Sequence, residues 1–208
     1  PRLSLSFPGV KQFFSLMPPR LLTVGVSEVQ KLALGFFATS LGNLSFVVIS
    51  LGLRLMTIPI RLFGVPISQA SLPFLSAESG KARSGKKDLK RFSNLVIEAL
   101  HQIAFLAYPA SMLLLILRIP FVRLIFGTHN FPWKTTLATG KVVAIISISI
   151  GAQAMVQLLI RAFHALQDTM TPFWITVSTA GFYLISNWYF VFKSTLGVTG
   201  LAISTTLA

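Results

Sequence analysis

The chain has 208 residues, of which 53% are hydrophobic and only 11% are charged. A soluble domain carries about 25% charged residues, so this chain could not cover itself with a hydrated surface, and a water-soluble globular enzyme is excluded. The absence of cysteine excludes disulfides and thiolate metal sites. The composition predicts an all-α protein, a polytopic bundle of transmembrane helices.

Basic residues outnumber acidic ones by 18 to 5, which gives a net charge of +13. Six of the 18 lie in one short stretch between Lys81 and Arg91, with an apolar block on either side. Cytoplasmic loops of membrane proteins carry an excess of Lys and Arg. We therefore expect a cytoplasmic basic loop over residues 76–91, and no nucleic-acid partner.

Apolar segments of spanning length follow one another along the chain. Crossing the hydrocarbon core takes about 20 helical residues. The turn-like sequence Gly42-Asn43-Leu44-Ser45 divides the first apolar region into two helices. Because the basic stretch is expected to be cytoplasmic and successive spans alternate in direction, Asn43 and, further along the chain, His129 are expected outside. The missing initiator Met and the apolar C-terminus predict a fragment of a longer transporter. The pattern predicts one membrane domain, 1–208, with five full spans and a truncated sixth at residues 12–41, 44–75, 93–117, 139–161, 172–192 and 196–208.

Arg54 is the most informative residue of the second predicted span. It lies about 15 Å below the external face at helical rise, close to the bilayer midplane, where an arginine costs several kcal/mol. No carboxylate occupies a neighbouring helical position. A guanidinium matches phosphate bidentately, so the pattern indicates an anionic ligand. A partner elsewhere, or snorkelling to the interface, is the alternative.

Other polar residues are candidates for a cavity or a gate. Arg61, two turns after Arg54, either extends a cationic track or, as we favour, reaches the interface with its charged head. Asn187 belongs to a weaker polar stripe in the fifth span, where plain packing is favoured. Residues recurring every fourth position in the fourth span form either a cavity face or a contact between helices; they are Ser149, Gln153, Gln157 and Arg161.

The sequence offers few groups of residues that could catalyse a reaction. No two of the five acidic residues form a close pair, and the three histidines lie on separate segments without metal-ligand spacing. No phosphate-cradling loop rich in glycine is present. We therefore expect no enzyme activity, no catalytic residue, no metal site and no cofactor.

Three stretches resemble the MurJ/MviN family over essentially the whole chain. RLMTIPIRLFGVPI, residues 54–67, resembles a family signature, and RAFHALQDTMTP, residues 161–172, matches the pattern Arg-x-Phe-x-Ala-x-x-Asp-Thr-x-Thr-Pro. The segment from Tyr108 to Phe131 agrees in order and spacing. The resemblance implies half of a two-lobe MOP-superfamily transporter, without its first lobe, in the bacterial cytoplasmic membrane. It implies a lipid II flippase that works by alternating access, with membrane lipids and a lipid-linked pyrophosphate sugar as partners.

The resemblance also bears on individual residues. Arg54 falls on the position of the cavity arginine of the second lobe. Relatives that bind sodium use acids where this chain has Leu34 or Gly35, and Val191, so the resemblance does not predict sodium coupling, although Asn187 is kept.

Asp168, or Thr169 beside it, can cap the helix that Thr171-Pro172 opens. Arg161 and Asp168 could pair across the connection between the fourth and fifth predicted spans. We favour a rigid connector at this place over a gate. The near alternative in function is a MOP flippase for another polyprenyl-linked oligosaccharide. A membrane-embedded enzyme or a scaffold of cell-wall lipid-carrier metabolism is the distant one.

Overall fold

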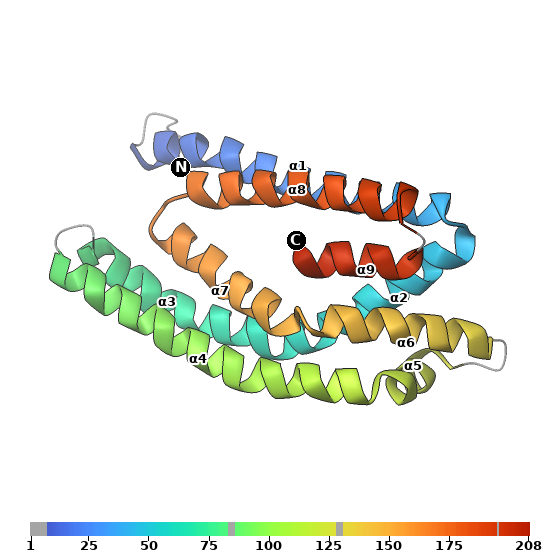
Figure 1. Cartoon of the computed structure of the whole chain (residues 1–208). Helices are drawn as coiled ribbons and strands as arrows, with labels where there is room; N and C mark the ends of the chain where they lie inside the picture. The colour runs from blue at the N-terminus through green and yellow to red at the C-terminus, as the bar shows by residue number, and fades with distance from the viewer. Residues whose placement is uncertain (1–7, 83–85, 128–130, 195) are drawn as a thin grey trace, which may run out of the picture.

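The computed structural model describes residues 8–82, 86–127, 131–194 and 196–208. These residues form helices and no strand (Figure 1), which confirms the all-α prediction. The helices are α1 (Pro8–Ser40), α2 (Asn43–Pro59), the π-helical segment η1 (Ile60–Gly64), α3 (Val65–Ala82), α4 (Lys86–Ile116), α5 (Arg118–Phe126), α6 (Trp133–Ser147), α7 (Ile150–Ala165), α8 (Met170–Phe192) and α9 (Val198–Leu207).

The helices run back and forth along one long direction (Figure 1). α1 and α8 lie side by side, α3 packs on α4, and α9 contacts both α6 and α8. The start of α1, the end of α3, the start of α4 and the α7–α8 corner share one end of the bundle, while the α1–α2 and α8–α9 corners share the other. This grouping is the one that the basic stretch and the turn at residue 42 predict.

The turn between α1 and α2 lies where the sequence predicts it. α1 ends at Ser40 and α2 begins at Asn43. Gly42 has a φ of 110°, a backbone conformation that glycine adopts without steric cost. Its N–H donates to the Thr39 carbonyl at 2.9 Å, so the reversal is closed locally.

The second predicted span is a single helical path that changes its winding midway. α2, η1 and α3 follow one another without a break from Asn43 to Ala82. The π-helical segment begins immediately after Pro59, which has no N–H to continue the α-helical ladder. The apolar path Asn43–Ser79 has 37 residues, or about 55 Å at helical rise. This length exceeds the hydrocarbon core of about 30 Å, so one end of the path projects beyond the membrane.

The fourth predicted span is bent rather than straight. α6 and α7 meet at 51° across Ile148 and Ser149. The N–H groups of both residues donate three positions back, to Ile145 and Ile146, and the Ser149 hydroxyl also donates to the Ile146 carbonyl. Tight turns of this type and hydroxyls that compete for helix carbonyls bend helices. An apolar run of the right length does not reveal such a bend.

Several predicted boundaries are wrong because hydropathy marks the membrane and not the end of a helix. α3 continues to Ala82 and α4 already begins at Lys86, so the predicted basic loop 76–91 is mostly helical, with residues 83–85 outside the described part. Lys, Arg, Glu and Ala all favour helix, which explains the extension. The segment between the predicted spans 93–117 and 139–161 contains the helix α5. Arg123 of α5 lies 5.4 Å from the centroid of the Trp133 ring.

Length and hydropathy together single out some of the predicted spans. Within the described ranges, three helices are long and apolar enough to cross a membrane, and the bent pair α6–α7 makes a fourth. α8 has 23 residues but is more polar, since it carries Asn, Tyr, Trp and Thr side chains among its apolar ones. It lies along α1, where Phe37 and Phe192 stack edge to face at 6.2 Å.

The core runs along the packing of α2 on α6 and of α7 on α3 and α4. Ile49, Leu55, Ile146, Ile150 and Leu158 are fully buried there. In a membrane, helices associate through close van der Waals packing more than through the hydrophobic effect. The packing is tight enough that a Cβ built on Gly52 of α2 would lie 2.7 Å from Val142 of α6. The core therefore fixes which face of α2 points away from the bundle.

The orientation predicted from the basic stretch can be tested with single cysteines, because the chain has none of its own. Asn43 and Lys90 are exposed and lie at opposite ends of the bundle. We expect an impermeant thiol reagent to label Asn43→Cys in intact cells, and Lys90→Cys only after the cells are lysed. Labelling of Lys90→Cys alone in intact cells would invert the orientation.

Candidate functional site

Arg54 lies on the face of α2 that this bundle leaves uncovered. Gly52, Leu55 and Met56 face the core and are buried, whereas Arg54 and Thr57 are exposed. Within the described part of the chain, Arg54 forms neither an ion pair nor a side-chain hydrogen bond, and the nearby Thr57 hydroxyl donates to the Arg54 carbonyl at 2.7 Å. The guanidinium is thus free to bind a group that is not part of these helices.

Arg61 lies beyond Arg54 on the same continuous helical path. It belongs to η1 and is exposed, while Ile60 beside it is buried. The π-helical turn ends at Gly64, which packs directly against Ala154 of α7. The changed winding in η1 therefore determines the direction of the Arg61 side chain relative to that of Arg54.

The polar stripe of the fourth span serves two different contacts. Ser149 is buried, and Gln153, Gln157 and Arg161 are half-buried. Gln153 donates to the Ser149 hydroxyl at 3.3 Å and lines a cavity of about 380 Å³ among α1, α2, α7, α8 and α9. Arg161 instead donates to the Val65 carbonyl at 3.3 Å, which ties α7 to the start of α3. Both interpretations of the stripe thus describe part of it.

The cavity beside Gln153 also contains side chains that the sequence did not single out. The Lys31 Nζ lies 2.6 Å from the Glu28 Oε1 on the same helix, α1. This i, i+3 pair is visible in the sequence and is the signal that could have identified Lys31. Thr205 of α9 was not detectable, because no periodic pattern develops within so short an apolar helix. The polar residues that line the cavity are Ser27, Gln30, Lys31, Gln153, Thr179, Tyr183 and Thr205.

Asn187 is buried in α8, and neither its amide nitrogen nor its amide oxygen has a hydrogen-bond partner in the described part of the chain. The Tyr183 side chain, one turn earlier, is its polar neighbour, although no hydrogen bond of normal geometry joins the two. A buried amide without partners is costly. Asn187 is therefore the residue in α8 whose polarity the packing does not explain.

Asp168 caps α8, as the sequence predicts. Its Oδ1 accepts from the N–H groups of Met170 and Thr171 at 3.1 and 3.0 Å, and its Oδ2 accepts from the Thr171 hydroxyl at 2.6 Å. The predicted pairing of Asp168 with Arg161 is wrong, because these oxygens bind the start of α8 and Arg161 binds Val65.

The end of α7 is closed by a matching backbone motif. Asp168 N–H donates to the Phe163 carbonyl, and Gln167 N–H donates to that of His164, both at 3.0 Å. Together they form a Schellman motif. Gln167 takes the left-handed position of this motif, with a φ of 59°, where glycine is usual. The α7–α8 corner is therefore fixed at both sides.

The Asp168 cap gives a testable effect on stability. The hydrogen bonds from Thr171, through its hydroxyl and its N–H, lower the pKa of the Asp168 carboxyl. The stabilisation is therefore complete above the ordinary aspartate pKa of about 3.9 and is lost as the pH falls through the lowered pKa. We expect Asp168→Ala to lower the free energy of unfolding by about 1 kcal/mol at neutral pH.

Asp168→Asn is the matched control for this prediction, since asparagine also caps helices, and it should lose less stability than Asp168→Ala. Thermal unfolding in detergent micelles between pH 3 and pH 7 measures both effects. The difference between the wild type and Asp168→Ala should shrink at acid pH. A difference that stays constant would mean that the carboxylate does not act through the cap.

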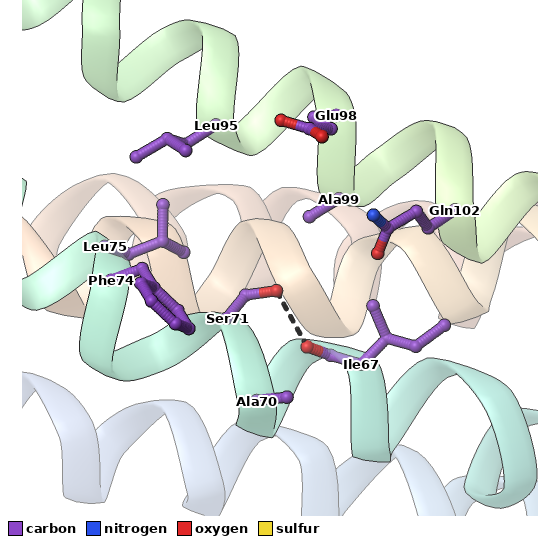
Figure 2. A pocket seen from close by; sticks show the side chains of 9 residues that line it. All are labelled: Ile67, Ala70, Ser71, Phe74, Leu75, Leu95, Glu98, Ala99 and Gln102. Atoms are coloured by element: carbon purple, nitrogen blue, oxygen red, sulfur yellow. Dashed lines mark hydrogen bonds between the residues drawn. The ribbon is translucent and has the colours of Figure 1, made fainter.

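A separate groove of about 350 Å³ lies between α3 and α4. Figure 2 shows Ala99 and Gln102 of α4 opposite Ile67 and Ser71 of α3. The Ser71 hydroxyl donates to the Ile67 carbonyl at 2.8 Å, so it is engaged within its own helix. The groove contains none of the candidate site residues and is distinct from the face that carries Arg54.

Solved structures with this arrangement of helices are membrane transporters. The chain superimposes with a TM-score of 0.75 at 22% identity on a structure described as "Lipid II flippase MurJ, inward closed conformation", covering 97% of this chain and 42% of that one. An outward-facing MATE family multidrug resistance transporter of the MOP superfamily gives a TM-score of 0.69 at 17% identity, covering 95% of this chain and 42% of that one. The fold is that of MOP-superfamily transporters.

The sequence places the chain within this class. The family model described as "Lipid II flippase MurJ" matches residues 1–208, and the chain belongs to this family. A relative from Thermotoga maritima, named "Probable lipid II flippase MurJ", is 27% identical over 203 residues, which are 98% of this chain and 40% of the relative. The chain thus spans about 40% of the length of that curated relative. With its spanning helices, family membership places it in the bacterial inner membrane as a multi-pass protein.

Proposed function

We propose that this chain takes part in flipping lipid II, the lipid-linked peptidoglycan precursor, across the cytoplasmic membrane. The family supports the substrate, and Arg54 is the observation that carries the proposal. A guanidinium at membrane depth is retained only where its charge is used. Arg54 is exposed on α2 without an ion pair among the described residues, and a diphosphate is a ligand that it can bind bidentately.

In the proposed mechanism, Arg54 holds the diphosphate while two lobes rock about a central cavity in alternating access. These helices supply one lobe, and the face of α2 that carries Arg54 points toward the other. Arg61 and the polar residues Gln153 and Asn187 are secondary candidates for contacts or gating. No covalent step is needed, so we propose a transporter and not an enzyme.

We also propose that transport does not depend on a sodium ion held in this lobe. Leu34 and Val191, at positions where sodium-binding relatives are expected to carry acids, are apolar side chains packed against the core. Gly35, the other candidate position, has no side-chain ligand to offer. Lipid II and the surrounding membrane lipids are then the proposed partners, without a metal or a cofactor.

Complementation tests the substrate. The open reading frame that contains this chain should restore growth to a bacterial strain depleted of its own lipid II flippase. The same plasmid in a strain that lacks its O-antigen flippase, which carries another polyprenyl-linked oligosaccharide, should restore nothing. Rescue of the second strain alone would replace lipid II by that substrate class, and rescue of neither strain at normal expression would contradict the proposal.

A further inference from the structure

A second basic site lies at the end of the bundle, away from Arg54. The N-terminal half of α1 passes close to the α7–α8 corner (Figure 1), and a cavity of about 390 Å³ lies between them. Arg20 of α1 and His164 of α7 line this cavity from two sides, and Thr169 adds a hydroxyl. Met17, Leu21 and Val24 form its apolar wall. The cavity is therefore basic in one part and apolar in another.

The position of the cavity along the membrane normal separates these two parts. The apolar segment of α1 that can cross the membrane begins at Arg20, and His164 lies in the last turn of α7. Both side chains therefore lie near the end of the bundle where the basic stretch between α3 and α4 also lies. Leu21 and Val24 follow Arg20 into the apolar segment, so the apolar wall extends toward the hydrocarbon. A ligand that fits both parts has an anionic head and an apolar chain.

The charges around the cavity favour an anion. No carboxylate lines it within the described part of the chain, and Arg20 forms no ion pair there. The nearest acidic residue in sequence, Asp168, uses its oxygens to cap α8. The Arg20 guanidinium is close enough to act electrostatically on the His164 ring. An anion between these two groups would pair with the guanidinium and accept a hydrogen bond from the imidazole N–H.

We propose that this cavity binds the phosphate group of an anionic phospholipid from the cytoplasmic leaflet. Arg20 and His164 hold the phosphate, the Thr169 hydroxyl donates to it, and Leu21 and Val24 contact an acyl chain. The cytoplasmic leaflet is rich in anionic lipids, which attract basic groups at its surface. The bound lipid bridges α1 and the α7–α8 corner, two parts of the bundle that approach each other at this end.

Native mass spectrometry of the purified chain tests the proposal, with phosphatidylglycerol and phosphatidylcholine of identical acyl chains as probes. We expect phosphatidylglycerol to bind at least tenfold more tightly than phosphatidylcholine. The double variant Arg20→Gln, His164→Gln should lose at least tenfold in affinity for phosphatidylglycerol. Lys90→Gln is the matched control, because Lys90 is an exposed cation at the same end of the bundle, and it should bind as the wild type does.

A second variant separates a lipid from a bare anion. Leu21→Asn keeps Arg20 and His164 and makes the apolar wall polar, so it should weaken phosphatidylglycerol binding and leave competition by inorganic phosphate unchanged. Equal binding of the two phospholipids, or an equal loss in Lys90→Gln, would overturn the proposal. Full affinity of Leu21→Asn would show a phosphate site without a lipid chain and would also overturn it. None of these outcomes affects Arg54, which lies on a different helix.

Discussion

Arg54→Ala is expected to abolish complementation of a flippase-depleted strain while the protein still reaches the membrane. Each hydrogen bond to a charged group contributes about 1.5–3 kcal/mol, so the loss of a bidentate pair weakens diphosphate binding by roughly a hundredfold or more. Removal of an unpaired arginine from a membrane helix does not disturb insertion, since that residue is the costly one. We therefore expect normal expression, measured by immunoblot of membranes, together with absent growth.

Two further variants show whether the geometry of the cation matters. Arg54→Lys should recover little growth, because an ammonium presents a point charge and not the planar fork of a guanidinium. Arg61→Ala removes an exposed cation of the same helical path and should be milder. Normal growth of Arg54→Ala at normal expression would mean that Arg54 has a structural partner and does not bind the diphosphate. The same result is expected if the protein is a scaffold and not a transporter.

The sequence predicts the parts of the fold that follow from local physical chemistry. Glycine at position 42 is required by a positive φ, and the turn lies there. Asp168 caps α8 because its oxygens reach the free N–H groups of the first helical turn. Both depend on residues within a few positions of each other. Patterns of this kind can be read from one sequence.

The bends and the extents of the helices could not be predicted in the same way. The 51° bend between α6 and α7 arises from hydrogen bonds three residues back at Ile148 and Ser149, within a run that carries no charge. The π-helical winding after Pro59 depends equally on how Gly64 packs against α7. Hydropathy and the length of an apolar run mark neither feature, even though the hydrogen bonds that form the bend are local.

The candidate site shows the same division. The lack of a carboxylate beside Arg54 at neighbouring helical positions is predictable, because the carboxylates near it in sequence can be counted. The different roles of Gln153 and Arg161 were not, since the first lines a cavity and the second binds a carbonyl 96 residues away. A periodic polar stripe identifies a helix face, and the tertiary fold decides what each position on that face contacts.

Gly64 is a position where we expect a clear loss of stability. A Cβ built there would lie 3.0 Å from the Cβ of Ala154, 3.1 Å from its Cα and 3.2 Å from its carbonyl oxygen. Two of these three atoms are backbone atoms and cannot rotate away. Gly64→Val would therefore push η1 away from α7, and overpacking of this kind costs about 1–3 kcal/mol. Thermal unfolding in micelles should show a clearly lowered midpoint.

The same substitution at Gly181 is the matched control, because nothing lies within 4 Å of a Cβ built there. Gly181 is exposed in the interior of α8, so Gly181→Val should leave the midpoint unchanged or raise it slightly. If Gly64→Val unfolds as the wild type does, the close approach of η1 and α7 does not stabilise the continuous helical path of α2, η1 and α3. The expected loss would instead show that the contact between Gly64 and Ala154, which lies on the helical path just beyond Arg61, stabilises the fold.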